Sequence, residues 1–240
     1  MKQPSPQGRT AMDRNVNAVR ATATAFAVYA GILGMEHGFF EAMHGNAATK
    51  SLRIMAAGFE LPFPFGHEPA MTLIPNFLVT GIAAMMAGLA IVLWLVAFVQ
   101  RRHGAAILFL LSVVLLLVGG GFGPISLLIV ACVAAAGIGK PLTCWRRHLP
   151  TQLTDGLARF WVWSFAAALL WVPGEFAAGQ IFHLKNDQRQ ILTNLNLMLS
   201  YPMLGLFVLT LVAGFAHEAW RQSDLEKAGS KGQANLSSRS

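Results

Sequence analysis

Apolar residues occupy this chain in long blocks that polar residues interrupt only at intervals. The blocks span approximately 17–40, 70–99, 105–118, 124–138, 157–182 and 194–215. They show neither the alternation of a half-buried strand nor the apolar stripe of a soluble amphipathic helix, and several approach or exceed the roughly 20 residues that cross a bilayer. The pattern predicts an all-α fold, a polytopic membrane protein with a bundle of six transmembrane helices.

The polar segments complete the predicted organisation. Residues 1–16 form an N-terminal tail, and residues 41–69 form a connection on the outer side of the membrane. Residues 217–240 form a second polar tail, whose Gly/Ser-rich end is predicted to be disordered. The six-helix domain therefore covers residues 17–216.

A few residues break the helical pattern inside or beside the blocks. They are Pro75, Asn76, Pro173 and Pro202. Proline removes a backbone donor and clashes with the preceding turn, so we expect bends or kinks at these positions. The interrupted starts of the second and sixth helices are the predicted moving parts of the protein.

The composition agrees with a membrane protein. Hydrophobic residues make up 55% of the 240 residues and charged residues only 12%, whereas soluble domains average about 25% charged residues. The mean hydropathy is +0.52 and the sequence pI is about 10.0. Because the positive charge lies in short loops and tails, the expected partner is the lipid bilayer and not a nucleic acid.

The distribution of lysine and arginine predicts the orientation. With both termini in the cytoplasm, fourteen of the 18 lysines and arginines lie inside and four lie outside, as the positive-inside rule requires. We therefore predict an integral protein of a bacterial plasma (inner) membrane with cytoplasmic N and C termini. The inner clusters Arg101/Arg102 and Arg146/Arg147 are expected to attract anionic lipids.

Ionisable residues gather where the first apolar block ends. This stretch holds Glu36, His37, Glu41 and His44 within nine residues. On a helix, His37, Glu41 and His44 would share one face because their spacing is i, i+4 and i+7. Carboxyl and imidazole groups are costly to bury at membrane depth, so they indicate a functional site.

The predicted orientation brings further acidic and histidine residues to the same outer side. Glu175 and His183 repeat the eight-residue spacing of Glu36 and His44. A second tier lies closer to water and consists of Glu60, His67 and Glu68. We predict an outward-facing pocket enclosed by the first, second and fifth helices.

Three chemistries fit such a pocket. Imidazole and carboxylate ligands suit a divalent transition metal such as zinc, iron, copper or manganese. Chains of acidic and histidine residues also relay protons in pumps and transporters. His37 and His183 are candidate axial ligands of a haem, which is the third alternative.

Transport of an ion or small solute, linked to a metal or to protons, is the leading functional hypothesis. The first alternative is a membrane-embedded metal- or haem-dependent enzyme acting on a lipid or quinone. The second is a non-catalytic structural or assembly subunit, which would need an exposed face of small residues; Ala83–Gly88 is the candidate. The sequence leaves open whether the protein is an enzyme, what its cargo is and whether it forms an oligomer.

Overall fold

The computed structural model describes residues 17–55, 69–98, 101, 103–142, 145, 150–181 and 189–237. Within these residues the chain forms six helices and one pair of antiparallel strands. In chain order they are α2 (Ala18–Ala42), β1 (Arg53–Met55), β2 (Pro69–Met71), α3 (Phe77–Phe98), α4 (Gly104–Leu117), α5 (Phe122–Gly137), α7 (Thr151–Ile181) and α8 (Arg189–Ser237). The helical prediction is confirmed, and the short β1–β2 pair is an addition to it.

Three helical segments are long and apolar enough to cross a membrane. They are Ala18–Ala42, Phe77–Phe98 and Pro202–Lys227. The helices α4 and α5 are apolar but shorter. The prediction of a membrane protein is therefore supported by length and composition, while the predicted number of six spans and their orientation stay predictions.

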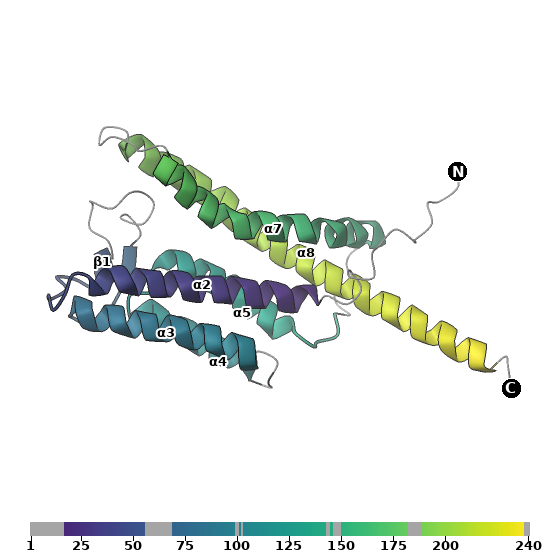
Figure 1. Ribbon diagram of the computed structural model, residues 1–240. Coiled ribbons are helices and arrows are strands. Elements are labelled where there is room, and N and C mark those ends of the chain that lie inside the picture. The colour runs from purple at the N-terminus through teal and green to yellow at the C-terminus, as the bar shows by residue number, and fades with distance from the viewer. Residues whose placement is uncertain are drawn as a thin grey trace.

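The helices form two groups that cross each other (Figure 1). In the first group α2 packs most extensively against α3 and α5, and α4 packs against α3 and α5. In the second group α7 and α8 pair along their lengths, and α8 contacts both α2 and α5. The α7–α8 pair diverges from the first group at one end, and α8 extends beyond the bundle at the other.

Small residues hold α2 and α3 close together. A methyl group on Gly38 would lie 2.5 Å from the carbonyl oxygen of Gly81, and one on Gly31 would lie 2.8 Å from that of Gly88. The two helices are therefore antiparallel, and only glycine fits at their contact points. Ala84 is fully buried on the same side of α3. The small-residue face Ala83–Gly88, which was predicted as a contact surface for a partner protein, therefore packs within the chain.

Aromatic residues attach the α7–α8 pair to the N-terminal half of α2. The ring of Phe26 lies 6.2 Å from that of Phe165 in α7 and 5.4 Å from that of Phe207 in α8, measured between centroids. The indole N–H of Trp161 donates a 3.1 Å hydrogen bond to the Thr22 hydroxyl. This bond satisfies a polar group that would otherwise be buried without a partner.

Several predicted boundaries differ from the structure, and the first is the start of the second helix. The sequence predicted that this helix begins near residue 70, but Pro69–Met71 forms strand β2 and α3 begins at Phe77. The Asn76 side chain accepts a 3.1 Å hydrogen bond from the backbone N–H of Val79. Asn76 therefore caps α3 and is not part of the helix, because a side-chain acceptor here satisfies a free amide of the first turn.

The second difference concerns the last helix. The sequence predicted its end near residue 215 and a disordered tail, whereas α8 continues to Ser237. Pro173 and Pro202 lie inside α7 and α8, which continue through them. The fifth helix also begins earlier than predicted, at Thr151 and not near residue 157.

Candidate functional site

The buried face of α2 carries two ionisable residues. Its apolar part includes Ala23, Ala27, Ala30 and Gly34 at spacings of three and four, and His37 and Glu41 continue the same series. The side chain of His37 is 6% exposed and that of Glu41 is 0% exposed. Because residues at this spacing share one side of a helix, both side chains follow the stripe into the bundle.

The carboxyl group of Glu41 lies against the turn between α4 and α5. This turn contains Gly119, whose φ is +93°, in the region that favours glycine. A methyl group on Gly119 would overlap both oxygens of the Glu41 carboxyl group. Glycine at this position therefore makes the turn possible and also leaves the space that Glu41 fills.

Both oxygens of Glu41 are buried and accept no hydrogen bond from any group that the structure describes. The amides of the adjacent turn donate elsewhere: the Gly119 N–H donates to the Met71 carbonyl and the Gly120 N–H to the Leu115 carbonyl, each at 2.9 Å. Buried polar groups in proteins almost always have a partner. The carboxyl group of Glu41 is therefore an exception that calls for an explanation.

A hydrogen-bond network fixes the turn in place beside Glu41. Thr72 and Val118 form an isolated antiparallel bridge, and the Thr80 hydroxyl donates to the Val118 carbonyl at 2.8 Å. The hydroxyls of Thr72 and Thr80 also bond to each other, and both side chains are almost completely buried. Strand β2, the start of α3 and the α4–α5 turn are thus joined around one end of α2.

Of the three residues predicted to share one helical face, only His37 and Glu41 do so. Helix α2 ends at Ala42, and His44 lies in the turn that follows. His44 is exposed and its ring packs on Phe77, with the centroids 4.7 Å apart. The prediction that His44 shares the face of His37 and Glu41 was therefore wrong, because the helix stops before reaching it.

Other predicted site residues are placed only in part. Glu36 is half-buried beside His37 on α2. Glu175 lies in α7, but its side chain is outside the described part of the structure, as are His183, Glu60, His67 and Glu68. The predicted pocket shared by Glu36 and Glu175 thus stays a prediction. In the described residues α5, more than α7, packs beside α2.

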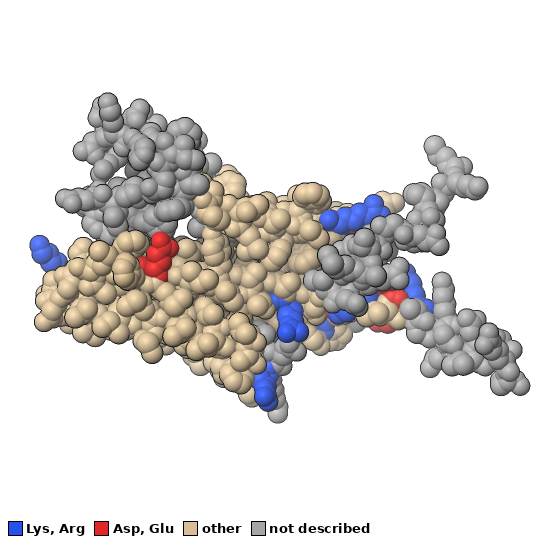
Figure 2. All heavy atoms as spheres, viewed as in Figure 1, with Lys and Arg blue, Asp and Glu red and all other residues tan. Residues whose placement is uncertain are grey.

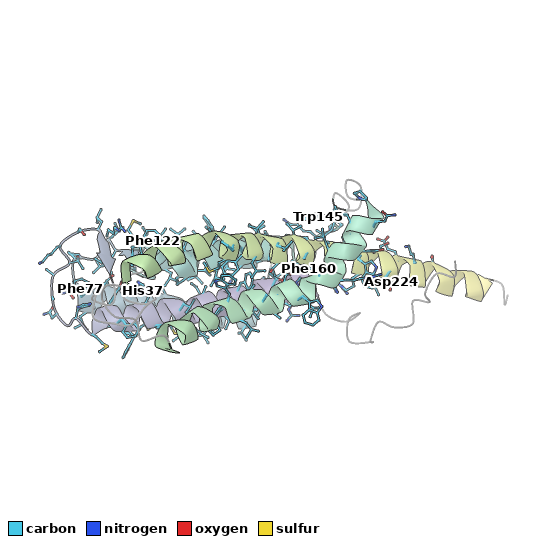
Figure 3. All side chains as sticks on the ribbon, turned by 90° about the horizontal axis from the view of Figure 1, so that it is seen from above. His37, Phe77, Phe122, Trp145, Phe160 and Asp224 are labelled. Atoms are coloured by element: carbon cyan, nitrogen blue, oxygen red, sulfur yellow. The ribbon has the colours of Figure 1, made fainter. Side chains whose placement is uncertain are left out.

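The ionisable pair lies at one end of the bundle. Figure 3 shows His37 near Phe77 and Phe122, which begin α3 and α5, while Trp145 and Asp224 mark the opposite end. No group of three or more His, Cys, Asp or Glu residues that could hold a metal occurs among the described residues. The metal and haem hypotheses, which included His183, are therefore untested.

The two ends of the bundle differ in charge. Lys50 and Arg53 follow α2 at the Glu41 end. The other described lysine and arginine side chains lie toward the end at which α2 begins, and they are Arg20, Arg101, Lys140, Arg159, Arg221 and Lys227. Figure 2 shows most of the positive residues of this view at that end and an uncharged surface across the middle of the bundle. Arg102, Arg146 and Arg147 are outside the described residues.

The contact between Gly119 and Glu41 was not predicted from the sequence. The glycines of residues 119–121 fall between the predicted helices 105–118 and 124–138, and the structure confirms a turn there. All three glycines serve the turn itself, because Gly119 and Gly121 have φ of +93° and +78° and a methyl group on Gly120 would overlap Leu115. The contact with Glu41 could not be found without knowing how α2 is aligned with the turn.

Comparison with known protein families, curated proteins and solved structures finds no match for the chain.

Proposed function

We propose that this integral membrane protein moves an ion or small solute by a proton-linked process, and that the Glu41 carboxyl group takes up and releases the proton. The observation that supports this proposal is the burial of both Glu41 oxygens without a hydrogen bond from the described residues. An ionised carboxylate in such surroundings is strongly disfavoured, whereas a protonated one is tolerated. Glu41 can therefore change charge only if its surroundings change with it.

A structural role explains Glu41 poorly. Leaving a buried polar group without a partner costs about 1–3 kcal/mol. An apolar side chain at this position would fill the same space without that cost. Residues that reduce stability in this way are typical of functional sites.

His37 is the second residue of the proposed path. It lies one helical turn before Glu41 on the same buried face, and histidine occurs beside acidic residues in the proton relays of pumps and transporters. Glu36 is half-buried beside it and provides a carboxyl group closer to the surface. In this path Glu41 and His37 pass the proton between them inside the protein, and Glu36 exchanges it with the surroundings.

The charge difference between the ends favours an orientation for this path. Most described lysines and arginines lie at the end opposite Glu41, and positive residues are enriched on the cytoplasmic side of membrane proteins. We therefore place the Glu41 end at the outer side of an inner membrane. Six spans with both termini in the cytoplasm fit this placement.

A flux measurement tests the proposal. The purified protein is placed in vesicles that enclose a pH-sensitive dye, and a potassium gradient with valinomycin sets a membrane potential. We expect proton entry with the natural protein and none with Glu41→Gln, which keeps the size of the side chain but cannot ionise. Glu36→Gln is the control and should slow entry without abolishing it. Equal proton entry in the natural protein and Glu41→Gln would contradict the assignment of Glu41.

A metal site is the second candidate, and the spacing of His37 and Glu41 favours it. An i, i+4 pair on one helical face can bind a single ion, and both side chains face the interior. Elemental analysis of purified protein distinguishes the two candidates. A stoichiometric metal that is lost in His37→Ala and in Glu41→Gln would favour metal binding over proton transfer.

A further inference from the structure

Proline and glycine interrupt the regular pattern of both α7 and α8. Pro173 and Gly174 lie inside α7, and Pro202 and Gly205 lie inside α8. These two residue types are the least favourable ones in the interior of a helix, and each proline removes the backbone hydrogen bond to the carbonyl four residues before it. Helices bend most readily at such residues, so we call these four residues the hinge.

The two halves of the hinge lie at the same level of the α7–α8 pair. The rings of Phe165 and Phe207 pack against the same residue, Phe26 of α2, and therefore mark a common level. Pro173 is eight residues beyond Phe165, about 12 Å at 1.5 Å per residue. Pro202 is five residues before Phe207, about 7.5 Å in the same direction because the two helices are antiparallel. The difference is less than one helical turn.

Packing does not account for the hinge residues. All four are exposed, and a methyl group on Gly174 or Gly205 would meet no atom of the described residues within 4 Å. The glycines between α2 and α3 differ, because a methyl group there would meet the backbone of the other helix. Residues that weaken a helix without serving a contact are typical of functional positions, and here the property they provide is bending.

The α7–α8 pair is attached to the first group of helices on one side of the hinge. Besides the aromatic contacts of Phe26, the indole N–H of Trp161 donates to the Thr22 hydroxyl. The Gln222 side chain accepts a 3.2 Å hydrogen bond from the Leu142 N–H just beyond α5. These residues come before the hinge in α7 and after it in α8. Toward the Glu41 end the pair diverges from α2 (Figure 1).

The face of α2 that turns toward the α7–α8 pair carries Glu36. Thr22 and Phe26 contact the pair, and Leu33, Glu36 and Phe40 continue the same face at spacings of seven, three and four. Counted from Phe26, Glu36 is about 15 Å along α2, which places it beyond the level of the hinge. Glu36 is half-buried in this arrangement. A bend of the pair toward α2 would therefore bring it over Glu36.

We propose that the parts of α7 and α8 beyond the hinge form an arm, which bends as one unit and closes over Glu36. The parts before the hinge stay attached to α2 and α5. Closure separates the Glu36 carboxyl group from the surroundings, and opening restores its exchange of protons. This control of proton exchange rests on the proposed function, whereas the bending itself does not.

Distances between pairs of spin labels, measured by double electron–electron resonance in lipid bilayers, test the bending. In a variant without Cys132 and Cys144, labels are attached through Phe39→Cys near the end of α2 and Ile181→Cys at the end of α7. A kink of about 20° moves the end of a 12 Å arm by about 4 Å. We therefore expect two distances that differ by about 4 Å.

A second pair of labels is the control for this measurement. Val133→Cys in α5 and Val162→Cys in α7 replace exposed residues that lie on the attached side of the hinge. This pair should give one narrow distance. A single distance for the first pair, as narrow as that of the control pair, would overturn the proposal.

Alanine at all four hinge positions locates the bend. Pro173→Ala, Gly174→Ala, Pro202→Ala and Gly205→Ala are combined, because alanine favours an uninterrupted helix. The population of the closed arm should fall at least about tenfold, while the control pair keeps its distance and shows that the fold is intact. Gly156→Ala changes an open position of α7 before the hinge and should keep both distances. Two distances that persist in the four-residue variant would overturn the assignment of the hinge.

Proton entry into vesicles connects the arm with the proposed function. The four-residue variant should slow proton entry about tenfold, and Gly156→Ala should not change it. Proton entry at the natural rate in the four-residue variant would contradict the role of the arm. Two label distances in a natural protein that admits no protons would support the hinge and contradict the proposed function.

Discussion

Replacing Glu41 by methionine is expected to stabilise the folded protein. Both carboxyl oxygens are buried without a hydrogen bond from the described residues, and this arrangement costs about 1–3 kcal/mol. Methionine has a similar length and no polar atom, so it should recover most of that free energy, less a packing cost below about 1.5 kcal/mol. At roughly 2–4 °C per kcal/mol for a domain of this size, the midpoint of thermal unfolding should rise by a few degrees.

Thermal unfolding in detergent, followed by size-exclusion chromatography of the protein that stays soluble, measures this change. Glu36→Met is the matched control, because Glu36 is on the same helix but only half-buried. Its unfolding midpoint should change by less than that of Glu41→Met. A decrease in the midpoint of more than about 2 °C with Glu41→Met, beyond what the packing cost explains, would refute the reasoning, since it would show that the carboxyl group makes a favourable interaction in the folded state.

Further substitutions test the packing that positions Glu41, with Gly205→Ala as a control at an open site. Gly119→Ala should destabilise the protein by about 1–3 kcal/mol, because φ at this position is unfavourable for alanine; adding Glu41→Ala should recover the part due to overlap, which a double-mutant cycle measures. Gly81→Ala should cost about 1–3 kcal/mol because the methyl group would meet the backbone of α2. Gly205→Ala, where nothing lies within 4 Å, should be neutral or slightly stabilising in the same unfolding assay. Asn76→Ala should cost about 1 kcal/mol through loss of the cap on α3, and an unchanged midpoint would show that the cap contributes nothing.

The helices themselves could be predicted from the sequence because their apolar blocks are long. The turn between α4 and α5 was also predictable, since the glycines of residues 119–121 interrupt an apolar stretch. The strands β1 and β2 were not, because they are three residues each and their stability comes from pairing across the connection. The continuation of α8 to Ser237 was missed because polar composition was interpreted as disorder.

The candidate site was predictable in its residue types but not in its geometry. The spacing of His37 and Glu41 within α2 correctly indicated a shared face. His44 does not share that face because the helix ends at Ala42. The signal for this end is Gly45, which has a φ of +69°, followed by Asn46, since glycine and asparagine commonly follow the C-terminus of a helix. The contact between Glu41 and the α4–α5 turn depends on how the helices pack. The close approach of Gly38 and Gly81, which aligns α2 with α3, is visible only in three dimensions.

The most direct test of the central claim is infrared spectroscopy of the protein in lipid membranes while the pH is changed. If Glu41 is a buried carboxyl group that takes up and releases a proton, the natural protein will show the carbonyl band of a protonated carboxylic acid in an apolar site. That band will disappear at high pH and be missing from Glu41→Gln at every pH. A band that is identical in Glu41→Gln, or a natural protein with no such band at any pH, would contradict the account.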